Sequence, residues 1–220
     1  MKHLRLIYLL AAMLSVSCIA QYRADGPIES RSVVLTGTAT AIAVSHGVDV
    51  VVDADATLAE NEARIVTHSD VIDHVKVYVE EQTLYVKLDA PRAISTDRLE
   101  VYIPKFSYSS LAISAGAEFS DRAFSGAELT IAASAGAEVD ISGEADTLIV
   151  AASAGADLSL DELRVKSATV SASAGAEVEV YVTESLVANA SAGAEVSYKG
   201  NPHSVEVSKS AGGRVEHDND

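Results

Sequence analysis

The chain has 220 residues, of which 48% are hydrophobic and only 5% aromatic, and it contains no tryptophan. A core of small aliphatic side chains is therefore expected. Asp and Glu number 32 against 16 Lys and Arg, a formal net charge of -16 that excludes nucleic-acid binding and argues against sites that grip phosphates. The single cysteine excludes an intramolecular disulfide and a cysteine-based zinc site.

Residues 1–20 have the pattern of a secretory signal peptide. Lys2 and Arg5 precede an apolar run over residues 6–14, which is too short to span a bilayer, and small residues follow. The sequence Leu-Ser-Val-Ser before Cys18 resembles a bacterial lipobox, whose cysteine becomes a lipid-modified N-terminus, although Ser15 stands where a lipobox usually has leucine. Ordinary cleavage after Ala20 is the alternative. Both interpretations predict export, and residues 21–29 are interpreted as a linker.

Residues 30–105 form a second region that is typical of β-structure but lacks an obvious repeat. Strands are expected over 48–52, 76–79, 84–88 and 99–103, with a turn at 80–83 and an interruption at Pro104. Most of the tyrosines lie before residue 110. These larger side chains predict a wider core here than in the rest of the chain.

Residues 106–216 contain a regular repeat. The pentapeptide Ser-Ala-Gly-Ala-acid occurs five times, and a degenerate sixth copy follows before a solvated tail at 217–220. The copies begin at Ser114, Ser134, Ser153, Ser173, Ser191 and Ser210. A unit of this length cannot bury its own apolar face, so we expect the units to stack as coils around one core.

Within each copy the hydrophobic residues alternate with period two, which predicts strands with one buried face. In the third copy the inward set is Leu148, Val150, Ala152, Ala154, Ala156, Leu158 and Leu160. The outward set is Ser153, Gly155, Asp157 and Ser159. A helix would scatter these two sets over its surface. The predicted fold class is therefore all-β, a parallel β-solenoid after an irregular β-rich N-terminal part.

The acid of each repeat is expected outward at the same height in every coil. The resulting column would hold Glu118, Glu138, Asp157, Glu177 and Glu195. Neighbouring carboxylates about 5 Å apart repel by roughly 0.8 kcal/mol even in water. One interpretation is a site for divalent cations such as calcium, with no other cofactor. The other, which we favour, is a row of solvated charges that prevents lateral aggregation, because the dense glycine-aspartate pattern of calcium-binding repeats is absent.

The sixth copy differs from the others in a way that suggests a capping coil. Lys209 stands where earlier coils place an inward alanine, and such a lysine disfavours stacking of another coil. Arg214 replaces the acid and is expected beside Glu195.

Several segments together resemble a known family. The run 40–52, the strand 84–88, the strand 99–103 with Pro104, and the serial Ser-x-Gly-Ala-acid coils are similar to the putative auto-transporter adhesin, head GIN domain family, over about residues 30–215. The resemblance implies an exported bacterial envelope protein, often a lipoprotein, with a right-handed β-helix-like fold and no established enzymatic activity. It implies no catalytic residues.

The residues themselves favour binding over catalysis. A polysaccharide lyase needs Arg or Lys side chains to stabilise its substrate's carboxylate, and the coils almost lack them. A glycosidase needs two carboxylates in different environments, which identical stacked acids do not supply. The histidines outside the signal lack metal-ligand spacing; they are His46, His68, His74, His203 and His217.

We therefore expect a non-enzymatic, adhesin-like binding or scaffolding module with a repeated serine and acidic face. It would lie at the outer membrane, in the periplasm or on the cell surface, attached to the membrane through Cys18, with an envelope protein or glycan as partner. A carbohydrate-active enzyme on the same fold is the alternative.

Overall fold

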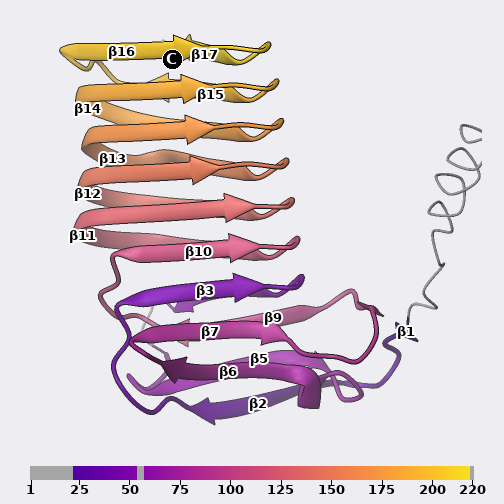
Figure 1. Ribbon diagram of the computed structural model, residues 1–220. Helices are drawn as coiled ribbons and strands as arrows, with labels where there is room; N and C mark the ends of the chain where they lie inside the picture. Colours follow the sequence, from indigo (N-terminus) through magenta and orange to yellow (C-terminus); the bar gives the residue numbers. More distant parts are fainter. Residues whose placement is uncertain (1–21, 54–56, 219–220) are drawn as a thin grey trace, which may run out of the picture.

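The computed structural model describes residues 22–53 and 57–218. Cys18 and the rest of the predicted signal lie outside these ranges. In the described part of the chain the fold is almost entirely β, and the one short helical element is the 3-10 turn η1 (Ile72–His74). About five turns of parallel β-solenoid follow an irregular N-terminal β part, which confirms the predicted fold class (Figure 1).

The strands before the long coils are short. They are β1 (Tyr22–Arg23), β2 (Ile28–Val34), β3 (Ala41–Ser45), β4 (Asp49–Asp53), β5 (Glu62–His68), β6 (Val75–Glu80), β7 (Thr83–Leu88), β8 (Ile94–Ser95) and β9 (Leu99–Pro104). Each strand expected in this region is present, and the turn between β6 and β7 falls at Glu81 and Gln82, both with positive φ. Part of the segment interpreted as a linker, β1, pairs with β8.

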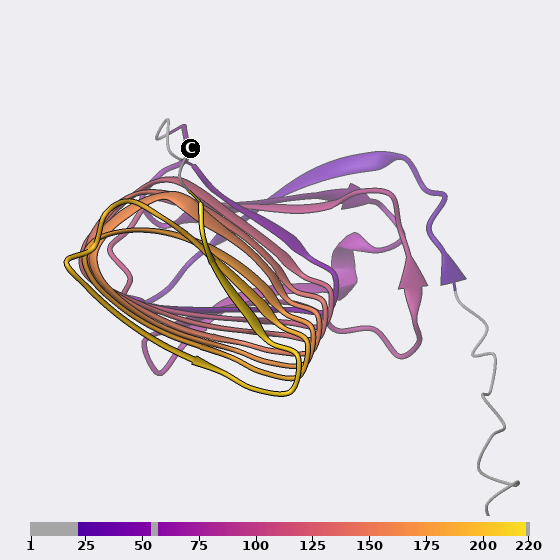
Figure 2. The ribbon, with the colours of Figure 1, turned by 90° about the horizontal axis from the view of Figure 1, so that it is seen from above.

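The coils are built from longer strands. They are β10 (Ser110–Ser114), β11 (Glu118–Ser134), β12 (Glu138–Ala152), β13 (Asp157–Ala172), β14 (Glu177–Ala190), β15 (Glu195–Lys199), β16 (Ser204–Lys209) and β17 (Arg214–His217). Each of β11 to β14 crosses one side of a flattened coil, rounds a corner where the register shifts, and ends on the other side (Figure 2).

The two sides of the coil are two sheets, which we name from the view in Figure 1. The front sheet runs in the order β6, β7, β3, β10, the final segments of β11 to β14, and β16. The rear sheet runs in the order β2, β5, β9, β4, the initial segments of β11 to β14, β15 and β17. Antiparallel strands end both sheets at the N-terminal end, with β6 in front and β5 with β2 behind.

The core is a single column of aliphatic side chains between the sheets. Leu148, Val150 and Ala152 point into it from the front, and Leu158 and Leu160 from the rear, all with at most 2% of their surface exposed. These are the inward residues that the alternation predicted, so burial follows the period-two pattern within each strand.

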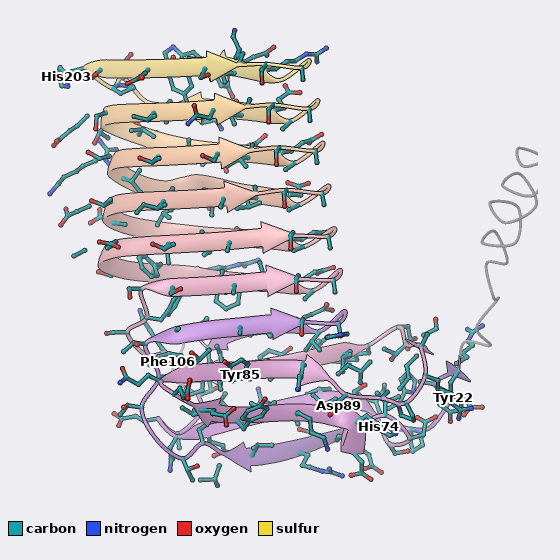
Figure 3. The ribbon with its side chains drawn as sticks, in the orientation of Figure 1. Tyr22, His74, Tyr85, Asp89, Phe106 and His203 are labelled. Carbon is teal, nitrogen blue, oxygen red and sulfur yellow. The ribbon has the colours of Figure 1, made fainter. Side chains whose placement is uncertain are left out.

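The aromatic residues do not lie where the sequence suggested. Tyr78 and Tyr85 stack on one another on the outside of the front sheet, with ring centroids 5.2 Å apart (Figure 3). The buried aromatic cluster lies instead around the first long coil, where Tyr108 packs edge-on against Phe119 and Phe124. Tyr78 and Tyr85 therefore do not contribute to the wider core that the larger side chains of this region predicted, because amphipathic tyrosines can cover the outside of a sheet.

Candidate binding faces

The Ser-Ala-Gly-Ala segment is a tight turn between the two sheets. In the third copy Ala154 has φ 52° and Gly155 φ 70°, and the Ala156 amide donates a 3.2 Å hydrogen bond to the Ser153 carbonyl. Two successive positive φ angles closed by such a bond are typical of a type I′ turn. The turns also stack, because the glycine amide of each coil donates to the alanine carbonyl of the next, as from Gly155 to Ala174 at 3.1 Å.

The turn differs from the prediction in two respects. The central alanine of the motif was assigned inward, as at Ala154, but it is exposed at the tip of the turn. The serine and the acid were assigned to one face, but Ser153 lies at the end of the front sheet and Asp157 at the start of the rear sheet. The physical reason is that the turn reverses the chain, so residues on either side of it belong to opposite sheets.

The outward side of the rear sheet, which we call the acidic face, carries the carboxylates in one register. The aligned residues are Glu100, Asp49, Glu118, Glu138, Asp157, Glu177 and Glu195, followed by Arg214. The predicted five acids are thus neighbours, and the structure adds Asp49 and Glu100, which sequence reasoning missed. In the next outward column, two residues further along each strand, acids such as Asp140 and Glu179 alternate with uncharged residues from coil to coil.

Arginines stand at both ends of this column. Arg98 donates to both carboxylate oxygens of Glu100 at 3.1 Å, and the Tyr102 hydroxyl donates to the same carboxylate at 2.9 Å. At the other end Arg214 Nη1 lies 3.8 Å from Glu195 Oε2. Among the described residues, the ion pairs found do not include the acids between these ends.

Asp49 is the carboxylate most affected by the column. It is half-buried on β4 between Glu100 and Glu118. Burial, together with repulsion from Glu118, Glu100 and Glu138, raises its pKa from 3.8 to about 6. The lining of a hollow over this part of the face includes five acids, with Arg122 as its basic residue; the acids are Asp49, Glu118, Glu138, Asp140 and Asp157.

The outward side of the front sheet, which we call the neutral face, has a different composition. Its last column before the turn holds Ser45, Ser114, Ser134, Ser153, Ser173 and Ser191. Its middle column holds Tyr85, Ala43, Ala112, Ala132, Ala151, Ser171, Asn189 and Ser208. Its first column holds Thr83, Ala41, Ser110, Thr130, Ile149, Thr169, Val187 and Glu206.

The C-terminal end of the solenoid is an open edge. Lys209 aligns with Ala190 in β14, and its side chain is exposed. Val205 and Val207 of the same strand are 43% and 40% exposed, because the described chain places no further coil over them. Lys209 and Arg214, the two residues predicted to cap the solenoid, thus lie on the last strands of the front and rear sheets.

The histidines are dispersed. His46 occupies the first turn position before Gly47, His217 stacks on Tyr198 with centroids 4.5 Å apart, and His203 begins the last coil (Figure 3). His68 is held by acceptors at both ring nitrogens: the Gly26 carbonyl at 2.5 Å and Asp97 at 2.6 Å. Across residues 22–53 and 57–218, no three His, Cys, Asp or Glu side chains are grouped so that they could hold a metal ion.

One further coil, in the N-terminal region, was not predicted from the sequence. Ser45-His46-Gly47-Val48-Asp49 occupies the pentapeptide position, with Ser45 aligned to Ser114 and Asp49 to Glu118. Its Gly47 amide donates to the Ala115 carbonyl at 3.1 Å, as in the other turns. The signal was present as Ser-x-Gly-x-acid, but histidine and valine replace the two alanines, and 69 residues separate Gly47 from Gly116.

Residues 39–202 match the family model of the putative auto-transporter adhesin, head GIN domain. The chain belongs to this family. The match covers most of the repeat and the coil at Ser45, in agreement with the resemblance found in the sequence. Membership supports a general role in binding at the cell surface and a non-enzymatic protein. No curated protein matches the sequence.

Solved structures share the fold. A putative adhesin from Bacteroides fragilis is 13% identical with a TM-score of 0.71, and the alignment covers 89% of this chain and 99% of that one. A putative adhesin from Parabacteroides distasonis is 14% identical with a TM-score of 0.53, over 90% and 100% of the two chains. A putative lipid binding protein from the same species is 15% identical with a TM-score of 0.50, over 90% and 100%. In the described ranges of this chain, no helix has the length and hydropathy needed to cross a membrane.

Proposed function

We propose that this chain is an exported, non-enzymatic, adhesin-like module of the cell envelope that binds its partner through the acidic face. The observation that supports this most directly is the column from Glu100 to Glu195, whose ion-paired members stand at its two ends, Glu100 beside Arg98 and Glu195 beside Arg214. Between these ends four exposed carboxylates face solvent at a spacing of about 4.8 Å, the distance between neighbouring strands; they are Glu118, Glu138, Asp157 and Glu177.

Such a column suits a partner whose polar groups also repeat along one direction. Carboxylates accept hydrogen bonds from hydroxyl groups and attract amines, so an envelope glycan or the basic surface of an envelope protein fits this chemistry. A site of this kind gains affinity from many equivalent contacts in parallel. Lipid attachment at Cys18 would hold the module at the membrane, with the solenoid extending from it.

The binding test uses two variants with the same change in charge. The triple variant Glu138→Gln, Asp157→Asn, Glu177→Gln removes three carboxylates from the column. The control removes Glu144, Glu162 and Glu184, which are exposed elsewhere on the coils, by the same Glu→Gln change. Immobilised wild type and control should retain envelope glycans or proteins from a detergent extract, and the triple variant should lose them. Equal retention by all three would overturn the role of the acidic face.

The enzymatic alternative has one observation in its favour, the raised pKa of Asp49 beside Glu118. The raised value comes from burial and from the column's own repulsion, and both follow from the packing of the acidic face without any need for a substrate. A glycan panel should therefore show no hydrolysis or elimination. Turnover that the variant Asp49→Asn abolishes would overturn the non-enzymatic proposal.

The anchoring step is tested separately. Mass spectrometry of the mature protein should find a lipid-modified N-terminal Cys18, and Cys18→Ser should release the protein from the membrane fraction. A mature chain that begins at Gln21 would show ordinary cleavage instead.

A further inference from the structure

The neutral face is a large, regular sheet surface with very little charge. It spans eight strands from β7 to β16 and consists of the three outward columns given above. Among these positions only Lys87 and Glu206 are charged, and they lie at opposite ends of the face. A fourth outward column lies between these and the corner in β11 to β16, and exposed Glu128 is its one acid; the others are Thr147, Ser167, Ser185 and Ser204. In the whole chain acids outnumber basic residues by two to one. Contact through this side therefore brings fewer carboxylates of two copies together than contact through the acidic face.

The area of the face is sufficient for a dimer. Eight strands at about 4.8 Å and a width of about 17 Å give roughly 650 Å² per copy, or about 1,300 Å² in total. Stable protein interfaces begin at about 1,200 Å². Ile149, which is 39% exposed, lies in the first column, about midway along the stack of strands. The other large exposed hydrophobic residues found in the described chain lie on the edge strands β2 and β16.

The spacing of the face favours a second copy over an unrelated partner. Small side chains such as Ala112, Ala132 and Ala151 let two sheets approach closely, and dry packing of that kind requires equal repeats on both sides. A partner with a different period would lose register within a few coils, whereas an identical solenoid stays in register along the whole face.

The N-terminal edge of the face shows how two copies would be oriented. In β6 the outward residues are Lys76, Tyr78 and Glu80, aligned with Lys87, Tyr85 and Thr83 of β7. A two-fold axis parallel to the solenoid axis, running along the middle column, exchanges the first and last columns at the same height. It places Lys76 of each copy opposite Glu80 of the other, and it brings the two tyrosine pairs together on the axis at this end of the interface; tyrosine is among the residue types that protein interfaces favour.

We propose that the chain forms a two-fold symmetric dimer through its neutral face, with parallel solenoid axes. The two acidic faces then point away from each other, which leaves both free to bind. The dimer does not depend on the proposed binding role of the acidic face, so either proposal can fail alone.

The first test measures mass and uses two variants in one strand. Ala132→Glu places a carboxylate at the centre of the neutral face, and Ala127→Glu places one at an exposed corner position of β11. Sedimentation equilibrium should show a dimer for wild type and for Ala127→Glu at about 50 µM, and Ala132→Glu should raise the dissociation constant at least about 100-fold. Because both positions are exposed, neither variant should change the melting temperature of the monomer, measured at a protein concentration well below the dissociation constant. A monomeric wild type, or a dimer that Ala132→Glu leaves intact, would overturn the proposal.

The second test examines orientation, in a Cys18→Ser background. Ala43 lies in the middle column, so Ala43→Cys should face its own counterpart across the axis and react with a short bifunctional thiol reagent. With antiparallel axes Ala43 would instead face the region of Asn189, about 24 Å from its counterpart. Cross-linking at Ala43→Cys but not at Ala127→Cys supports the parallel dimer. A dimer that does not cross-link at Ala43→Cys refutes this orientation.

Discussion

The front and rear sheets of the solenoid can be compared residue by residue, because each coil contributes to both. Val150 in front and Val139 behind pack into the same core and are equally inaccessible to solvent. Their outward neighbours differ: Ala151 stands next to the first, whereas Glu138 and Asp140 flank the second. Inward positions are fixed by packing, while outward positions are free to vary. A turn of two residues is thus enough to separate two surfaces of different chemistry along the whole molecule.

The largest expected effect concerns the corner that joins the rear sheet to the front sheet. Gly143 has φ 133°, and a Cβ atom there would lie 2.1 Å from the Phe124 carbonyl oxygen of the adjacent coil. Gly143→Ala should therefore destabilise the protein by about 3 kcal/mol, from backbone strain and a clash with main chain. Denaturant unfolding measures the change.

The control for this corner is a glycine of the opposite turn. Gly136 has φ 69°, and a Cβ atom added to it would have no heavy atom within 4 Å, so Gly136→Ala meets only the backbone penalty, about 1 kcal/mol. Equal losses at both positions would show that crowding at the Phe124 corner does not matter.

A smaller effect is expected at Asp49 on the acidic face. Its raised pKa means that the native state binds a proton more tightly than the unfolded chain, so its effect on stability becomes less favourable as pH rises from about 4 to about 6. Asp49→Asn removes this dependence. The variant should be more stable than wild type at pH 7 by on the order of 1 kcal/mol, after allowance for solvent screening, and should lose that advantage near pH 4.

Unfolding curves at the two pH values test this, with Glu184→Gln as the control. Glu184 is exposed outside the column, and its change should be within about 0.5 kcal/mol at both pH values. An Asp49→Asn variant with the same stability difference at pH 4 and pH 7 would contradict repulsion within the column.

The sequence predicts the sheets better than the turns, for a physical reason. Alternation in residues such as Leu148 and Val150 reflects burial directly, and the repeat length sets which residues become neighbours in the stack. Nothing in the alternation marks Ala154 as a turn residue, because alanine rarely adopts positive φ and the period of two continues through it. The glycine beside it was the only local indication of a bend.

The N-terminal contacts were harder to predict because they join residues distant in sequence. Glu100 enters the acidic column through pairing of β9 with β4, across an intervening excursion of the chain. Tyr22 donates a 2.6 Å hydrogen bond to Asp70, and His68 reaches Asp97. Such pairings carry no sequence period, so composition alone could not indicate them.

The turn between the two sheets should respond in the opposite direction to the corner. Ala154 adopts φ 52°, which strains an alanine but not a glycine. Ala154→Gly should stabilise the native turn, and the greater freedom of glycine in the unfolded chain offsets part of this, which leaves a gain of about 0.5 kcal/mol. Ala151→Gly, at an exposed strand position in the same coil, should instead destabilise the protein. Melting temperatures of the two variants that move in the same direction would contradict the strain at Ala154.

The smallest effect should leave both sheets of the solenoid unchanged. His68 lies on β5 and holds the segment from β1 to Gly26, which we call the N-terminal arm, since its ring bonds the Gly26 carbonyl and Asp97. Both partners are acceptors, so both ring nitrogens must donate, and only the protonated ring can do so. The bond to Asp97, then that to Gly26, and the nearby charge of Asp70 raise the pKa of His68.

The sign of the pH effect follows from this direction. At pH values below the ordinary histidine pKa of about 6.5, His68 is protonated and holds the arm fully. Its contribution to the stability of the arm is lost as pH rises through the higher pKa of His68 in the folded state. Hydrogen exchange at Ala24, whose amide donates to Ser95, should therefore accelerate in that window beyond the intrinsic rate, while exchange in β12 and β13 should not. His68→Gln donates to at most one partner at a time and does not titrate, so its exchange at Ala24 should be faster at low pH and lack the step. A step of equal size in His68→Gln would place the titrating group elsewhere.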